Sequence, residues 1–238
     1  MKITNRDAVI ARLVNQEKYN LSDLREVVAL LCGEGGCPWD MEQTHQSIRN
    51  DLIEETYEVV EAIDNEDSSL LHEELGDLLF QVIFHAQMEE EQQSFALEDI
   101  VSDISAKMIH RHPHVFGTVK VKNTGEVLKN WDAIKTEEKQ RISLTDKLRA
   151  IPPMLPSLMR AQKVAKKSGV YNGVDQATLC KELIKKAEAL STAEDREAAL
   201  GALLVTASAY AHTVGVSAEQ VLGNATNQFI DSLQDVEN

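Results

Sequence analysis

The sequence predicts an all-α protein made of two tandem helical-bundle repeats, the second a degenerate copy of the first. Three observations lead to this prediction. Apolar residues recur with the period of a helix along most of the chain, and no segment shows the convincing alternation of a strand. Only 5% of the residues are aromatic, which suits a helical protein better than a β-sandwich. The second half also repeats the apolar pattern of the first.

In the first half, the earliest clear helix follows Ser22, a residue type that caps helix N-termini. Its apolar residues fall at the i, i+3, i+4 and i+7 positions of one helix face: Leu24, Val27, Val28 and Leu31. Further helices are predicted at about 44–63, 70–88, 95–111 and 125–141. Pro113 and Gly117 should stop the third of these.

Residues 142–156 contain three of the five prolines, which predicts a linker. We therefore expect a first helical domain at 1–145, a Pro-rich linker at 146–156 and a second, degenerate helical domain at 157–238. Helical patterns resume after the linker at about 156–168, 177–190, 193–214 and 217–235.

The two repeats differ in their acidic residues. When Gly76 is aligned with Gly201, Ala199 stands in place of Glu74 and Ala202 in place of Asp77. Lys185 and Lys186 stand where the acid pair of the preceding helix would be. Any carboxylate metal site is therefore predicted in the first repeat alone.

The charge of the chain limits its partners. The net charge is −15, and residues 1–150 carry 16 basic and 29 acidic residues, a net charge of −13. An acidic protein is not expected to bind nucleic acid directly, because that requires a basic face. The sequence contains no CxxC pair, signal peptide or apolar run long enough to cross a bilayer, so we expect a cytoplasmic protein that does not enter a membrane.

The stretch EELGDLLFQVIFHAQ, residues 73–87, is apolar around most of a helix, and its polar residues form one narrow stripe. The stripe consists of Glu74, Asp77, Gln81 and His85. Such a helix should be largely buried, and a buried carboxylate needs a partner. No Lys or Arg occurs between Arg49 and Lys107, so a divalent cation is the simplest partner.

The preceding helix supplies further carboxylates. Its acids fall within an arc of about 120° at 100° per residue: Asp51, Glu54, Glu55, Glu58 and Glu61. Alone, this pattern also fits a solvated acidic face. The short link DNEDSS predicts antiparallel packing, which would bring these acids to Glu74 and Asp77. Carboxylate oxygens without cysteine favour Mg²⁺, with Mn²⁺ as a substitute, and such a site takes phosphate oxygens from a substrate.

EETYE followed by ELGD resembles the EExxE…ExxD pattern of the all-α nucleoside triphosphate pyrophosphohydrolases. With GCPWDMEQTH, RHPHVF and NWDAIKTEEK, the chain resembles the MazG family specifically, densely over its first 140 residues and loosely beyond them. The resemblance implies Mg²⁺-dependent hydrolysis of nucleoside triphosphates to the monophosphate and pyrophosphate by a homodimer.

The resemblance also implies roles for individual residues. The metal ligands would be Glu55, Glu58, Glu74 and Asp77. Glu54 and Glu55 would be catalytic, with Glu54 holding a second ion or orienting the attacking water. Nucleotide binding would fall to Lys107, Arg111 and Trp131.

The chemistry of these last residues agrees with that role, although each also has an ordinary structural interpretation. Lys107 and Arg111 lie on one helix face and could neutralise phosphate oxygens, and Trp131 could stack on a base. The family often has a basic pair before HPHVF, whereas His110 precedes Arg111 here.

Two alternatives to the enzyme differ in what the sequence must contain. A non-catalytic nucleotide-binding or partner-binding helical dimer is the alternative to the enzyme, and pyrophosphate release separates the two. A di-iron carboxylate bundle would need paired ExxH motifs, which the two acidic helices lack.

Overall fold

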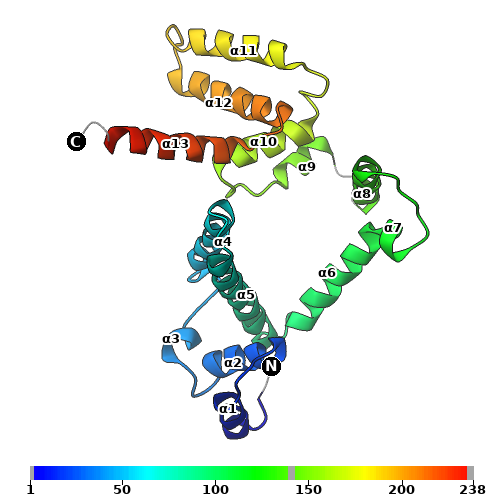
Figure 1. The fold of residues 1–238 in the computed structure, drawn as a ribbon, viewed down its shortest axis with the longest axis vertical. Coiled ribbons are helices and arrows are strands. Elements are labelled where there is room, and N and C mark those ends of the chain that lie inside the picture. Colours follow the sequence, from blue (N-terminus) through cyan, green and yellow to red (C-terminus); the bar gives the residue numbers. More distant parts are fainter. Residues whose placement is uncertain (1–2, 139–142, 235–238) are drawn as a thin grey trace. The chain divides into compact units, whose positions relative to one another are not determined.

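The computed structural model of the chain describes residues 3–138 and 143–234, and every regular element within these ranges is a helix (Figure 1). The prediction of an all-α protein is confirmed. The chain divides into two compact units, Met1–Lys135 and Thr136–Asn238.

The first unit begins with helices α1 (Arg6–Val14), α2 (Leu21–Cys32) and the short α3 (Pro38–Met41). The cap of α2 is Asn20, whose side chain accepts hydrogen bonds from the backbone N–H groups of Ser22 and Asp23. The carboxylate of Asp23 accepts in turn from the N–H of Asn20, which completes a capping box. The predicted cap at Ser22 is therefore wrong by two residues.

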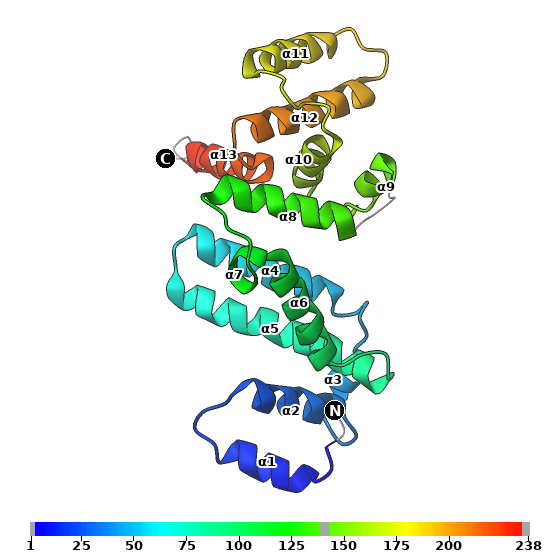
Figure 2. The same cartoon turned by 90° about the vertical axis from the view of Figure 1, so that its right-hand side faces the viewer.

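Helices α4 (Arg49–Asp64) and α5 (Ser68–Glu91) pack against each other as a hairpin (Figure 2). Asp67 caps α5 by accepting from the N–H groups of Ser69 and Leu70. Helix α4 starts five residues later than predicted, because Thr44 and Ser47 bond to each other's backbone in a turn. The short link predicted between the two acidic helices is confirmed.

The core of the first unit lies between α2, α5 and the start of α6. Its buried residues form one cluster: Val28, Ile48, Ile83, Phe84, Ala86 and Leu97. Burial of α5 is one-sided, however. Leu75 is 49% exposed, Leu79 41% and Val82 38%, so the prediction that this helix is largely buried is wrong for one face. Among the described residues of the first unit, none packs over that face.

The unit continues with α6 (Leu97–Arg111), α7 (Pro113–Phe116) and most of α8 (Thr124–Glu138), whose last residues belong to the second unit. The N-terminal end of α6 is held by Leu97 in the core and by Arg25 of α2, which forms ion pairs with Glu90 and Glu98. Helix α6 ends just before Pro113, as predicted, and its C-terminal end leads into α7 and away from α5 (Figure 1).

The second unit contains α9 (Leu144–Arg149), α10 (Ser157–Ser168), α11 (Gln176–Ala189), α12 (Arg196–Thr213) and α13 (Ala218–Gln234). Helix α12 packs against α10, α11 and α13. The predicted linker is wrong at its start, because α9 occupies its first residues and packs on α10, and Ile151 is buried. The ends of two predicted helices, at 139–141 and 235, lie outside the described residues.

Within the described part of the chain, no single helix is long and apolar enough to cross a membrane. The bent pair α12 and α13 passes such a test only when the two helices are taken together across a 105° bend.

Candidate metal and nucleotide site

The predicted carboxylates meet on the α4–α5 hairpin. Glu55 and Glu58 lie one turn apart on α4, and Glu74 lies on the facing part of α5. One oxygen from each side chain lies within 4.8 Å of an oxygen from the other two. Glu74 is only 9% exposed. The antiparallel packing of two acidic helices thus concentrates negative charge at one place.

Burial, and then this concentration of charge, raises the pKa values of two of these carboxyl groups. The pKa of Glu55 is raised by burial and then by the nearby charges of Asp77 and Glu58. The pKa of Glu74 is raised by burial and then by Glu58 and Asp77. Among the residues that the structure describes, no Lys or Arg side chain forms an ion pair with these acids. The cluster is therefore destabilised by like charges that a cation would neutralise.

The donor set suits one class of cation. Three carboxylates without sulfur are hard ligands, which favour Mg²⁺ or Mn²⁺ over transition metals that prefer thiolate or imidazole. Three protein ligands also leave room for water and for phosphate oxygens, as Mg²⁺ sites usually do.

The other two predicted acids occupy different positions. Asp77 is exposed and lies outside the group of three, but it is close enough to raise the pKa values of Glu55 and Glu74. Glu54 is exposed on α4 and is not part of the group. The structure therefore brings together three of the four predicted ligands, with the fourth nearby.

Two of the predicted nucleotide-binding residues, Lys107 and Arg111, lie near the C-terminal end of α6, and the third, Trp131, lies on α8. The core contact of α6, Leu97, is at the opposite end of that helix. The guanidinium of Arg111 lies 5.7 Å from the centre of the Trp131 ring, so two of the three residues are in contact. Lys107 is exposed one turn earlier on α6.

Two further side chains surround Trp131 and were missed in the sequence. Lys135 Nζ lies 5.6 Å from the ring centre, and His112 packs edge-on with 4.8 Å between centroids. The spacing of Lys135 from Trp131, i and i+4 on a helix, was a signal that could have found the lysine.

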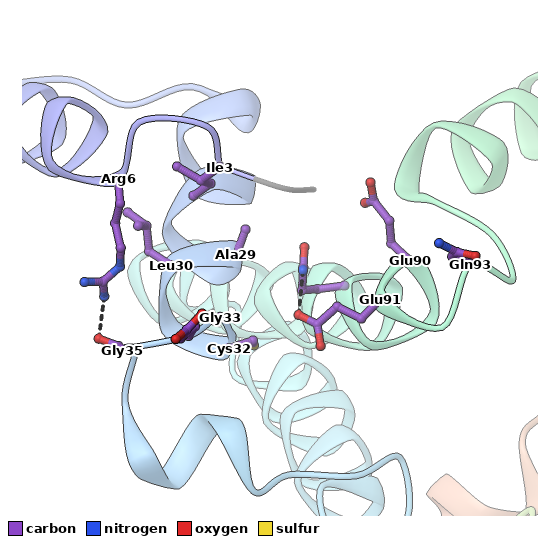
Figure 3. Close-up of a pocket in the computed structure, with 12 residues that line it drawn as sticks. Ile3, Arg6, Ala29, Leu30, Cys32, Gly33, Gly35, Glu90, Glu91 and Gln93 are labelled. Carbon is purple, nitrogen blue, oxygen red and sulfur yellow. Dashed lines mark hydrogen bonds between the residues drawn. The ribbon is translucent and has the colours of Figure 1, made fainter.

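A separate cavity lies elsewhere in the described part of the first unit. It has a volume of about 850 Å³ and lies where the ends of α2 and α5 meet, beside the loop whose Gly35 carbonyl accepts a hydrogen bond from Arg6 of α1 (Figure 3). Burial raises the pKa of the Cys32 thiol in this cavity to about 12, so it is no nucleophile at neutral pH. The cavity is lined by none of the metal-site carboxylates.

Comparison with known proteins agrees with this geometry. Residues 43–116 match the MazG nucleotide pyrophosphohydrolase domain, a segment that contains α4, α5 and α6. The nucleoside triphosphate pyrophosphohydrolase of Escherichia coli K12 is 42% identical over 215 residues, covering 86% of this chain and 81% of that protein. The Thermotoga maritima protein named nucleoside triphosphate pyrophosphohydrolase/pyrophosphatase MazG is 32% identical, covering 90% and 84%.

A third relative is longer than this chain. The uncharacterised protein YabN of Bacillus subtilis is 44% identical over 167 residues, which are 69% of this chain but 34% of YabN. The chain thus matches about a third of that protein. Long matches to two relatives, together with an all-α fold and a carboxylate cluster on the expected hairpin, confirm the resemblance seen in the sequence: the chain belongs to the MazG family of nucleotide pyrophosphohydrolases.

Proposed function

We propose that this protein hydrolyses nucleoside triphosphates to nucleoside monophosphate and pyrophosphate, with Mg²⁺ as cofactor and Mn²⁺ as a substitute. Activity would be carried by the first repeat. The carboxylate cluster of Glu55, Glu58 and Glu74 is the observation that supports this most directly, and the names of the relatives agree with it.

The residues have separate roles in binding the metal, activating water and binding the nucleotide. Glu55, Glu58 and Glu74 hold the cation, and Asp77 completes the set from the next turn of α5. A bound Mg²⁺ would supply positive charge to the polyphosphate and lower the pKa of water. Glu54 and Glu55 orient the attacking water and accept its proton while the bond between the α-phosphorus and the bridging oxygen breaks. Lys107 and Arg111 neutralise phosphate oxygens, and Trp131 stacks on the nucleotide.

We further propose that the protein is a homodimer. The support is a row of exposed apolar residues on each helix of the hairpin. Its residues recur at i, i+4 and i+7 on each helix: Ile53, Tyr57 and Val60 on α4, and Leu75, Leu79 and Val82 on α5. Exposed apolar rows of this kind mark interaction sites, and the same row on a second copy would be complementary to it.

The second unit is proposed to be a degenerate repeat that regulates or assembles but does not catalyse. In support, α11 and α12 pack together as α4 and α5 do, while alanines replace Glu74 and Asp77. We propose a cytoplasmic location, which a nucleotide substrate and three free cysteines support. We also propose that the protein does not bind nucleic acid directly, because its net charge is −15.

The experiment that tests this function is a panel of ribo- and deoxyribonucleoside triphosphates, incubated with Mg²⁺, with Mn²⁺ or with chelator. The products are resolved by anion-exchange chromatography. The expected products are monophosphate and pyrophosphate, formed only with metal. Release of diphosphate and orthophosphate would contradict cleavage at the α-phosphate. Nucleotide binding without any product would instead favour the non-catalytic dimer.

A further inference from the structure

One histidine beside Trp131 is fixed in place at the junction of two helices. His112 is the C-terminal cap of α6 and the N-terminal cap of α7. Its backbone N–H donates to the carbonyl of Ile109, and its own carbonyl accepts from the N–H groups of Val115 and Phe116. Its side chain is held as well, because Nδ1 lies 2.6 Å from the carbonyl oxygen of Met108. The residue is thus tied to the end of α6 through both its backbone and its ring.

The bond to Met108 decides where the ring carries a hydrogen. A backbone carbonyl only accepts, so Nδ1 of His112 is protonated and donates. The last four carbonyls of an α-helix have no partner within the helix. His112 satisfies two of them at the end of α6, that of Met108 with its ring and that of Ile109 with its backbone. The orientation of the imidazole is therefore set by α6 itself and needs no bound ligand.

The oriented imidazole packs against Trp131 of α8. The ring centroids lie 4.8 Å apart and the ring planes meet at 78°, which is the edge-to-face arrangement that aromatic pairs prefer. None of the closely packed helix pairs in the described part of the chain includes α8. The contacts of Trp131 with His112 and Arg111 therefore join α8 to the end of α6.

The two contacts differ in how well they can orient the indole. Arg111 has a long side chain with several rotatable bonds, whereas the imidazole of His112 is short and hydrogen-bonded to its own helix. A side chain that must be ordered on binding costs affinity, and one that is already ordered in the free protein avoids this cost. A nucleotide that stacks on Trp131 would therefore bind more tightly when His112 holds the ring.

We propose that His112 is a positioning residue for nucleotide binding, which holds the Trp131 ring in the orientation that receives the substrate. The proposal rests on the proposed function and deepens it, since it names the residue that orders the nucleotide-binding side chain. His112 itself touches neither the metal carboxylates nor the reacting phosphate in this role.

The second repeat has lost this arrangement together with the other residues of the site. When Lys107 is aligned with Gln228, Ser232 stands in place of Arg111 and Leu233 in place of His112. A leucine side chain cannot donate to a helix carbonyl, and Leu233 is 49% exposed. The repeat that lacks the metal carboxylates thus also lacks the arginine and the histidine, as expected if all of them serve one ligand.

Two substitutions separate an effect on Trp131 from an effect on the end of α6. His112→Asn removes the ring, but its amide nitrogen takes the place of Nδ1 and keeps a donor for the Met108 carbonyl. His112→Phe keeps a ring and removes the donor. If His112 only capped α6, His112→Asn would be the milder change. If it positions Trp131, His112→Phe should be.

The first measurement follows the Trp131 ring directly. The chain has two tryptophans, and the other, Trp39, is 59% exposed, so Trp39→Phe leaves Trp131 as the single indole. Time-resolved fluorescence anisotropy then reports motion of this ring on the picosecond-to-nanosecond timescale, without metal or nucleotide. We expect faster local motion when His112→Asn is added, and His112→Phe should recover part of the difference. Unchanged motion in His112→Asn would overturn the proposal.

The second measurement is steady-state kinetics with a nucleoside triphosphate and Mg²⁺. Loss of an aromatic pair of this kind corresponds to roughly a two- to tenfold change in binding. His112→Asn should raise KM by about that factor and leave kcat within about twofold, because the metal and the attacking water are not touched. His110→Asn, the same change at an exposed histidine of α6, is the matched control and should leave KM unchanged.

A second background shows whether His112 acts through the indole. In a protein that carries Trp131→Leu, adding His112→Asn should have no further effect on KM, because residues that act as a unit are not additive. A KM for His112→Asn equal to that of the wild type, or the same increase with and without Trp131→Leu, would overturn the proposal.

If His112→Asn does not fold, as judged by far-UV circular dichroism, His112→Gln removes the ring in its place and is judged in the same way. A wild-type protein that hydrolyses no nucleotide would refute the proposed function itself. The anisotropy needs no turnover, so it then decides the role of His112 alone: faster motion of Trp131 in the variant supports it, and unchanged motion refutes it.

Discussion

The charge cluster on the α4–α5 hairpin should make the protein less stable without metal and more stable with it. The informative change is Glu74→Gln, which keeps the shape of a side chain that is 9% exposed and removes its charge. Because the folded state raises the pKa of Glu74 and of Glu55, ionising these groups costs stability. We therefore expect the variant to melt at or above the wild type at pH 7 in chelator.

The pH dependence of the melting temperature tests separately whether the charge of Glu74 destabilises the folded protein. Below the unfolded pKa of about 4.3, the carboxyl is protonated in both states and the variant should match the wild type. As the pH rises through the raised folded pKa, the wild type loses stability that the variant keeps. The difference in melting temperature should therefore grow between pH 4 and pH 7.

Magnesium should reverse the order. At 100 times its Kd, a ligand stabilises the native state by about 2.7 kcal/mol, and at 10 times its Kd by about 1.4 kcal/mol. For the 135 residues of the first unit, an unfolding entropy of about 2.1 cal/mol/K per residue converts these values to shifts of roughly 10 °C and 5 °C. If losing Glu74 weakens binding about tenfold, the wild type should thus gain about 5 °C more than the variant.

The assay is a thermal melt followed by tryptophan fluorescence. Both tryptophans, Trp39 and Trp131, lie in the first unit, so the signal reports the unit that holds the site. Glu17→Gln, at an exposed position outside the site, is the matched control. A Glu74→Gln variant that melts well below the wild type in chelator, yet keeps the full magnesium shift, would mean that Glu74 serves the fold and not the metal.

Three other perturbations address separate parts of the molecule. Asp77→Asn should lower kcat for pyrophosphate release by orders of magnitude while the far-UV circular dichroism is unchanged, and activity within threefold of wild type would remove Asp77 from the site. Leu79→Glu places a charge in the exposed apolar face of α5, so light scattering should show the proposed dimer converted to monomer; a wild type that is already monomeric would refute the dimer. Asn20→Ala removes both side-chain bonds that cap α2, so urea unfolding should show a loss of about 0.5–2 kcal/mol, whereas no change would show that the cap is dispensable.

The sequence alone determined the helical class, because the period of the apolar residues and the punctuation by Pro and Gly are local properties of the chain. It also predicted that Glu55, Glu58 and Glu74 would meet, since a short link between two amphipathic helices leaves an antiparallel hairpin as the simple arrangement. The sequence predicted the ends of the helices less accurately than their existence. The capping box at Asn20 and the turn at Thr44 depend on which of several polar side chains forms the bond.

Only the tertiary structure decided which apolar residues are buried and which polar residues lack a partner. Leu75 and Leu79 look like core residues in sequence, yet they are exposed because no element in the described part of the unit packs over them. His45 contacts His85, forty residues away in the chain, and no periodicity links a turn to a helix. Whether Gln81 and His85 are satisfied likewise depends on every group that surrounds them, which is a property of packing and not of sequence spacing.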